Sequence, residues 1–247
     1  MSRLLGHHTV GSASRRLATL VRRGGPATAL STLLASLDEK YLRCFDRRYR
    51  IQTSGIILLP DTSFDRARLL DATQYSPING WGFRRFLKES AFPRNLHFVD
   101  VGCGLGRACI VAAEYGFEKV TGVDLAAEFC AAARRNIARC RPPSGRLSPI
   151  DIVQMDALLF CGQTDADLFL MFRPFSRDFT RAVRDAITQR ARGLNKLMTV
   201  IFTERMLVPD SHALIFAETG AFRPIRQARH WGQAFYVFQC GATNGPI

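Results

Sequence analysis

Strand-like and helix-like hydrophobic patterns alternate from about residue 95 to the end of the chain. A short apolar run bounded by turn residues predicts a buried strand, whereas apolar residues at i, i+3 and i+4 predict an amphipathic helix. Gly116 and Gly220 each follow a helical stretch, as glycine often does at helix C-termini. The predicted strands are 96–101, 119–125, 150–155, 167–172, 196–203, 222–229 and 234–239, and the predicted helices are 106–115, 126–139, 179–192 and 211–219.

This order of elements predicts an α/β fold. Strands that alternate with helices form a mainly parallel sheet covered by helices. The last two strands are joined by a short turn containing Gly232, which indicates a closing hairpin.

A separate helix is predicted before this region. It follows the Gly24-Gly25-Pro26 break and carries an apolar stripe, which we expect to pack on the main domain as a lid or flank. Association with a membrane surface is the weaker alternative. We therefore divide the chain into a basic arm or targeting segment (1–25), a helical flank (26–69) and the main domain (70–247). The stripe consists of Leu30, Leu33, Leu34, Leu37, Tyr41 and Phe45.

Charge is the unusual property of the composition. The 247 residues carry a net charge of +13, and residues 1–50 contribute +7 with ten basic and three acidic side chains. Such a segment can contact an anionic partner, nucleic acid or lipid, although a solvated basic arm is the simpler explanation. Residues 1–37 contain no acidic residue, which is also typical of an organelle transit peptide in a eukaryote.

The remaining composition is that of a soluble protein. No apolar run approaches the roughly 18–20 residues that span a bilayer, so we expect no membrane span. The seven cysteines form no C-x-x-C pair, and the five histidines show no zinc-ligand spacing. We therefore expect free thiols, no metal, and a cytoplasmic location, with organelle targeting as the alternative for a eukaryotic source.

The most informative segment is Asp100-Val101-Gly102-Cys103-Gly104-Leu105-Gly106, where a strand runs into a glycine-rich turn and then a helix. Ligands of open α/β sheets bind at the carboxyl ends of the strands. The G-x-G-x-G spacing differs from the G-x-G-x-x-G of dinucleotide sites. Asp100 would repel a pyrophosphate but attract the ammonium and sulfonium of S-adenosylmethionine. The segment thus favours the methyl donor over NAD, and Cys103 is expected only to fill the turn.

Two further aspartates end predicted strands on the same edge of the sheet. Asp124 lies about 20 residues beyond the glycine turn, where a carboxylate can accept hydrogen bonds from ribose hydroxyls. Its alternative role is to cap the following helix. Asp156 can accept a hydrogen bond from the adenine amino group, with Ala157 donating from its backbone, or can be an ordinary loop residue.

Together these motifs resemble the class I S-adenosylmethionine-dependent methyltransferases over about residues 70–240, and more loosely a poorly characterised bacterial branch of them. The resemblance implies a Rossmann-like, seven-stranded, mainly parallel sheet with an antiparallel last strand and helices on both faces. It implies S-adenosyl-L-methionine as cofactor. The residues it implies for the donor are Asp100, Gly102, Cys103, Gly104, Gly106, Asp124, Leu125, Asp156 and Ala157.

Two segments are candidates for contact with the acceptor. Phe172-Arg173-Pro174-Phe175 resembles the Asn/Asp-Pro-Pro-Tyr/Phe motif of amine methyltransferases, but a guanidinium at Arg173 cannot accept a hydrogen bond from an amino group. Arg173 can instead hold an acidic group or phosphate, or be a surface residue. In the second segment, Tyr75 and Trp81 can form a wall over the donor or join the core. The candidates are therefore Tyr75, Trp81, Arg173, Pro174 and Phe175, and no catalytic base is assigned.

The leading hypothesis is a methyltransferase whose acceptor is a small molecule, a protein or a nucleic acid. The alternatives are a methyltransferase directed at nucleic acid or the ribosome, favoured by the positive charge, and a non-catalytic donor-binding protein, favoured by the altered motif at residues 172–175. A nicotinamide-dependent oxidoreductase is disfavoured by Asp100 and by the glycine spacing.

Overall fold

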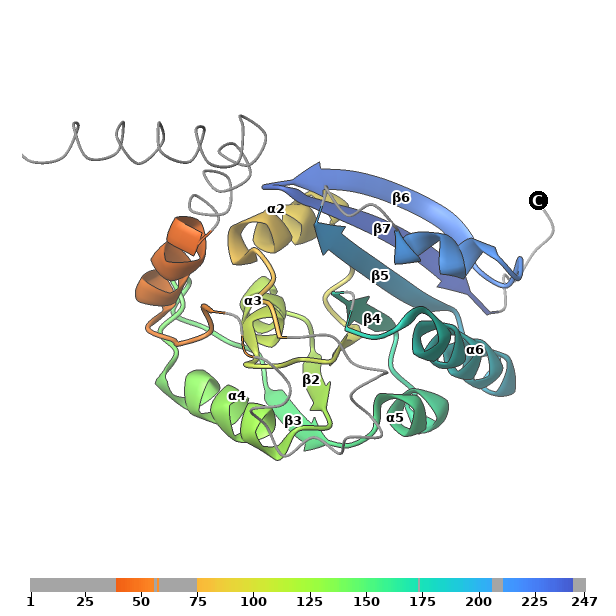
Figure 1. The fold of residues 1–247 in the computed structure, drawn as a ribbon, viewed down its shortest axis with the longest axis horizontal. Coiled ribbons are helices and arrows are strands. Elements are labelled where there is room, and N and C mark those ends of the chain that lie inside the picture. Colours follow the sequence, from red (N-terminus) through yellow and green to blue (C-terminus); the bar gives the residue numbers. More distant parts are fainter. Residues whose placement is uncertain (1–38, 56, 58–74, 173, 206–210, 242–247) are drawn as a thin grey trace, which may run out of the picture.

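The computed structural model describes residues 39–55, 57, 75–172, 174–205 and 211–241. Seven strands form one sheet in the order β3-β2-β1-β4-β5-β7-β6 (Figure 1). All neighbouring pairs from β3 to β5 are parallel, whereas β7 runs antiparallel to both β5 and β6. The strands are β1 (His97–Val101), β2 (Lys119–Asp124), β3 (Ile150–Gln154), β4 (Leu168–Met171), β5 (Met198–Arg205), β6 (Arg223–His230) and β7 (Gln233–Cys240).

Helices cover both faces of this sheet. A helix at residues 39–49, orange in Figure 1, precedes the labelled elements. The labelled helices are α2 (Gly80–Ser90), α3 (Arg107–Tyr115), α4 (Ala127–Arg139), α5 (Ala157–Gln163), α6 (Arg177–Gly193) and the 3-10 helix η3 (His212–Ala217).

The core has two halves, because successive side chains of each strand point to opposite faces of the sheet. Phe98 of β1 belongs to the cluster shared with α2, α3 and the helix at 39–49. Its neighbour Val99 belongs to the cluster shared with α5, α6 and η3. The predicted mainly parallel sheet with an antiparallel last strand and helices on both faces is confirmed, and every predicted strand is present with ends shifted by at most two residues.

Three features of the helices differ from the sequence-based prediction. Residues 80–90, for which no element was predicted, form α2, and α5 was not predicted either. Gly80 and Gly82 allow α2 to pack closely: a Cβ on Gly80 would lie 2.4 Å from the Phe45 ring. The helix predicted at 211–219 is a shorter 3-10 helix.

Only part of the N-terminal prediction falls on described residues. The arm at 1–25, the stripe residues Leu30–Leu37 and the boundary at residue 69 lie outside them. Of the remaining stripe, Phe45 is fully buried while Tyr41 is 45% exposed. Among the described residues no helix has the length and apolar character needed to cross a bilayer.

Candidate functional site

The glycine loop connects β1 to α3 at the carboxyl edge of the sheet. Its three glycines have φ values of +78° (Gly102), +50° (Gly104) and +83° (Gly106), a region that other residues enter only with strain. The amides of Gly102 and Cys103 both donate to the Val123 carbonyl at 2.9 Å. The loop is therefore fastened to β2, the next strand of the sheet.

Two residues from distant segments lie directly on this loop. A Cβ on Gly104 would lie 2.4 Å from the Tyr75 ring, and one on Gly102 would lie 2.7 Å from Cβ of Pro174. The Tyr75 hydroxyl donates to the Thr53 carbonyl at 2.7 Å, and burial raises the pKa of Tyr75 above its usual value. Tyr75 and Pro174 thus cover two of the three glycines.

Asp100 is a buried carboxylate beneath the loop. It is 4% exposed, and the Cys109 thiol donates to its Oδ2 at 3.5 Å. Burial raises the pKa of Asp100 to about 7; the Cys109 hydrogen bond opposes this shift and the charge of Asp124 adds to it. A cationic ligand group placed beside Asp100 would favour its ionised form.

Asp124 ends β2 and accepts hydrogen bonds from the loop itself. The Gly104 amide donates to Oδ2 at 2.8 Å, and the Ala126 amide donates to Oδ1 at 3.0 Å. Burial raises the pKa of Asp124, while these backbone donors lower it. Because a carboxylate offers about four lone-pair positions, each oxygen retains capacity for a ligand hydroxyl. The N-cap of α4 is Ala126, so Asp124 supports the start of that helix without being its cap.

Asp156 caps a helix. Its Oδ1 accepts from the amides of Leu158 at 2.8 Å and Leu159 at 3.2 Å, which fixes the start of α5. Ala157, the first residue of α5, is 8% exposed, and Leu125 is half-buried. The structure thus places Asp156 in a capping role at the carboxyl end of β3.

The candidate acceptor residues divide between two locations. Tyr75 and Pro174 lie on the glycine loop, as described above. Phe175 packs edge-on against Phe179 of α6, with ring centroids 4.8 Å apart. Trp81 lies in an aromatic cluster, 5.2 Å from Phe45 and 6.1 Å from Tyr49 between ring centroids. Arg173 lies outside the described residues.

Arg107 is a site residue that the sequence analysis missed. It is the first residue of α3, directly after Gly106, and is 2% exposed. Its guanidinium donates to Asp46 Oδ1 at 2.9 Å and to Thr53 Oγ1 at 2.6 Å. The signal available in the sequence was an arginine at the start of a helix, followed directly by six apolar residues.

Asp46 organises the segment that Arg107 contacts. Its Oδ2 accepts from the amides of Thr53 and Ser54, each at 2.7 Å, and its Oδ1 accepts from the Thr53 hydroxyl at 2.7 Å. The Thr53 carbonyl in turn accepts from the hydroxyl of Tyr75. A continuous network therefore runs from the N-terminal helix to the ring that covers Gly104.

A second link is made by Asn136 of α4, which is 3% exposed. Its Nδ2 donates to the carbonyls of Leu105 and Gln52, both at 3.0 Å, and its Oδ1 accepts from the Gln52 amide at 2.9 Å. Residues 46–54 are thus joined to the α3 end of the glycine loop, through Leu105 and Arg107.

This arrangement can bind a cation and hydroxyl groups at the ends of β1 and β2. Asp100, which is buried, and Asp124, which is half-buried, flank a loop with three glycines. A ligand can approach the backbone of such a loop closely. Cys103 is not a nucleophile in this state, because a hydrogen bond with Cys109 and burial raise the pKa of its thiol well above the usual value.

Comparisons with known proteins concern the family of one segment and the fold. Residues 98–196 match the family model of a methyltransferase domain. A ribosomal protein L11 methylase from Lactobacillus delbrueckii subsp. bulgaricus is 18% identical, with a TM-score of 0.50 over 68% of this chain and 81% of that one. A magnesium protoporphyrin IX methyltransferase from Synechocystis, solved with its methyl donor, is 15% identical, with a TM-score of 0.48 over 66% and 78%. No curated protein sequence matches the chain.

Proposed function

We propose that this chain, which carries a class I S-adenosylmethionine-dependent methyltransferase domain, holds its methyl donor at the ends of β1, β2 and β3. The observation that carries the assignment is a pair of carboxylates, buried Asp100 and half-buried Asp124, at the ends of adjacent strands beside the glycine loop. A pyrophosphate ligand would be repelled there, whereas an ammonium and a pair of ribose hydroxyls would be held.

Each residue of the site has a distinct part in this proposal. Asp100 attracts the donor's ammonium, and the ionised form that it needs is favoured once the cation is present. Asp124 accepts the ribose hydroxyls while it also holds the Gly104 amide. The start of α5, with Asp156 and Ala157, lies where the adenine ring would end. Gly102, Gly104 and Gly106, with Cys103 between them, let the donor lie against the backbone, and Leu125 borders it.

The donor supplies a methyl group on a positively charged sulfur, which an acceptor attacks in line while the carbon–sulfur bond breaks. The task of the protein is alignment, since orientation accounts for much of the catalysis in such displacements. Tyr75 and Pro174 stand over Gly104 and Gly102, so we assign them to the wall between donor and acceptor. Phe175 anchors the following residues on α6 through Phe179, and Trp81 stays with the aromatic cluster of Phe45. Arg173, beside Pro174, is the candidate for an acidic group of the acceptor.

The compartment and the acceptor are part of the same proposal. We place the protein in the cytoplasm, and the seven cysteines, all present as free thiols, support a reducing compartment. The L11 methylase and the protoporphyrin methyltransferase act on very different acceptors, so the fold leaves the acceptor open.

Calorimetric titration with S-adenosylhomocysteine, and separately with NAD, tests the donor site. We expect one-site binding of S-adenosylhomocysteine and none of NAD. Gly104→Val should abolish the binding, because a side chain there collides with Tyr75. Val111→Ala, in the buried part of α3, is the control for a general loss of stability and should retain binding. Undiminished binding by the Gly104→Val protein, or preference for NAD, would refute the assignment.

A further inference from the structure

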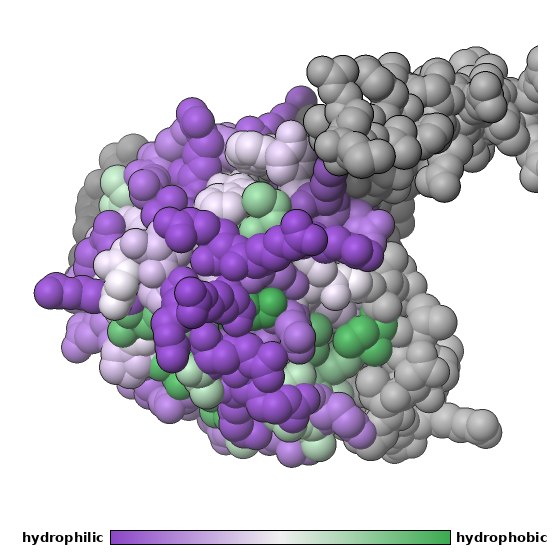
Figure 2. All heavy atoms as spheres, turned by 90° about the vertical axis from the view of Figure 1, so that its left-hand side faces the viewer, coloured by the Kyte–Doolittle hydropathy of each residue, from purple (hydrophilic) through white to green (hydrophobic). Residues whose placement is uncertain are grey.

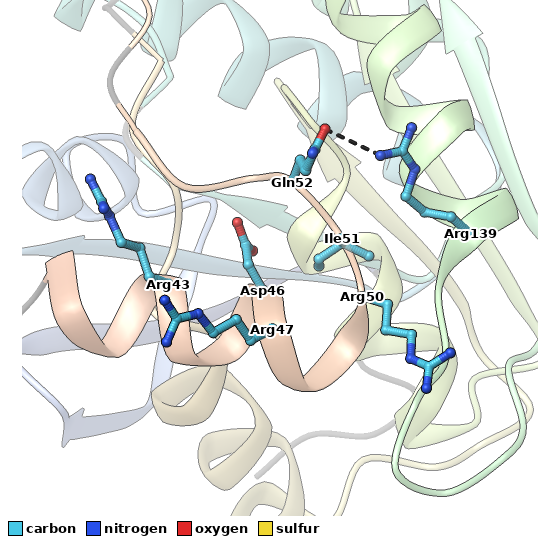
Figure 3. A pocket seen from close by; sticks show the side chains of 7 residues that line it. All are labelled: Arg43, Asp46, Arg47, Arg50, Ile51, Gln52 and Arg139. Carbon is cyan, nitrogen blue, oxygen red and sulfur yellow. Dashed lines mark hydrogen bonds between the residues drawn. The ribbon is translucent and has the colours of Figure 1, made fainter.

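A groove of about 360 Å³ lies between the helix at 39–49 and the C-terminal end of α4, outside the proposed donor site. Figure 3 shows Arg43 and Arg47 on the helix and Arg139 across from them on α4, where Arg139 is turned toward Gln52. The backbone at 51–52 forms the side nearest to the core. The lining residues are Arg43, Asp46, Arg47, Arg50, Ile51, Gln52 and Arg139.

The groove carries an excess of available positive charge. Arg43 pairs with Glu39 at 2.6 Å, and Arg139 donates to Oε1 of Gln52 at 3.1 Å. Arg47 and Arg50 are exposed, and neither has an ion pair or side-chain hydrogen bond with another described residue. Such guanidinium groups are suited to bidentate contact with phosphate oxygens.

Asp46, the acid in the lining, does not neutralise these two arginines. Its carboxylate is already engaged by Arg107 and by Thr53 and Ser54 on the side facing the core. The charge that faces solvent is therefore that of the arginines. The side of the molecule that carries the helix at 39–49 is largely hydrophilic in Figure 2.

Exposed aromatic side chains lie on the other flank of the same helix. Tyr41 is 45% exposed and meets Trp231, 49% exposed, edge to face with ring centroids 5.1 Å apart. Between this pair and the groove the exposed face of the helix carries Lys40 and Arg48. A cationic track beside exposed aromatic rings is the arrangement that binds the backbone and bases of a single-stranded nucleic acid.

The groove is coupled to the glycine loop. Asn136 donates hydrogen bonds both to the carbonyl of Gln52, in the wall of the groove, and to the carbonyl of Leu105, in the loop. Arg107, the first residue of α3, donates to Asp46, which also lines the groove. A polymer held in the groove would thus lie against the segment that supports Tyr75. One or two arginines suffice to bind a small anion, whereas basic side chains here follow one another along the groove and the exposed face of the helix. A chain of phosphates fits that arrangement better than a single anion.

We propose that this arginine groove binds the phosphodiester backbone of a nucleic acid. The ligand class follows from four arginines, on or just after the helix at 39–49 and on α4, two of them unpaired among the described residues. An exposed aromatic pair lies on the other flank of that helix. The inference does not depend on the donor site: donor binding and nucleic-acid binding are measured separately.

Fluorescence anisotropy of labelled single-stranded RNA and DNA of the same mixed sequence, with the full chain, tests this proposal. We expect Arg47→Ala/Arg50→Ala to weaken binding at least about tenfold. The slope of log K against log salt should fall by about 1.4, because each lost contact with a single strand removes about 0.7. Equal losses on RNA and DNA support a backbone site common to both, and a loss on RNA alone assigns the groove to RNA.

The control is Arg192→Ala/Arg223→Ala, which removes the same charge from exposed positions on α6 and β6. It should change the affinity less than about twofold. The proposal is overturned if both double variants lose affinity equally, or if neither nucleic acid binds. It is also overturned if Arg47→Ala/Arg50→Ala weakens binding to vesicles of phosphatidylserine and phosphatidylcholine but leaves nucleic-acid binding unchanged. If Arg47→Ala/Arg50→Ala still binds S-adenosylhomocysteine in the calorimetric titration, the variant is folded and its donor site is intact.

Discussion

Replacing Arg107 with methionine tests whether the N-terminal helix and the glycine loop form one structural unit. Methionine keeps much of the length and apolar character of the arginine stem but removes every donor. The change leaves Asp46 without its charged partner in a place where the two side chains are 12% and 2% exposed. It also removes the bonds to Thr53 Oγ1 and to the Ile78 carbonyl.

The expected cost is about 3 kcal/mol. Breaking a buried ion pair by removing one member costs about 3–5 kcal/mol, because the other charge stays buried and unpaired. Asp46 retains its hydrogen bonds from Thr53 and Ser54, which places the value at the lower end. For a protein of this size, about 3 kcal/mol lowers Tm by roughly 6–12 °C.

Urea unfolding and thermal melting measure the loss, with Arg135→Met as the matched control. Arg135 lies exposed on α4, so its replacement should change stability by less than about 0.5 kcal/mol. The combined Asp46→Asn and Arg107→Met variant should be less destabilised than the sum of the single changes, since the two side chains are in contact. Strict additivity, or an Arg107→Met protein as stable as the control, would refute the structural role assigned to the pair.

Two further predictions concern the donor site. Gly104→Ala should lower the free energy of unfolding by at least about 1–2 kcal/mol because of its φ of +50° alone. Adding Tyr75→Ala should restore only the part of the loss that comes from collision with the ring, as urea unfolding of the single and double variants will show. Asp100, with its pKa near 7, binds a proton in the folded state between about pH 4 and 7 where the unfolded chain does not, so stability should fall as pH rises through that window. In the Asp100→Asn protein, melting temperatures measured across that pH window should fall less than those of the unchanged protein. An unchanged pH profile in that variant would contradict the raised pKa.

The sheet could be predicted from the sequence because its signal is local. Strands such as 96–101 are short apolar runs between turns, and the glycine loop with Asp100 and Asp124 keeps its spacing along the chain. Where parallel strands end at one edge, residues at those ends meet whatever the side-chain packing is. The fold and the neighbourhood of the carboxylates follow from that geometry.

Other features depend on contacts between distant segments, which the sequence does not show. The glycines of α2 weaken any helix pattern at residues 80–90, and only the structure shows that Phe45 occupies the space that a side chain at Gly80 would need. Trp81 can cover a ligand or join the core, and its contacts with Phe45 and Tyr49 place it with the aromatic cluster. The pairing of Arg107 with Asp46 joins residues 61 positions apart, so hydrophobic periodicity could not reveal it.

A crystal structure of the protein with S-adenosylhomocysteine is the most direct test of the central claim. The account predicts the ammonium group near Asp100, the ribose hydroxyls within hydrogen-bond distance of Asp124, and Tyr75 and Pro174 on the side where the methyl group would point. Ligand bound away from the ends of β1 and β2, or ribose hydroxyls that do not reach Asp124, would contradict it.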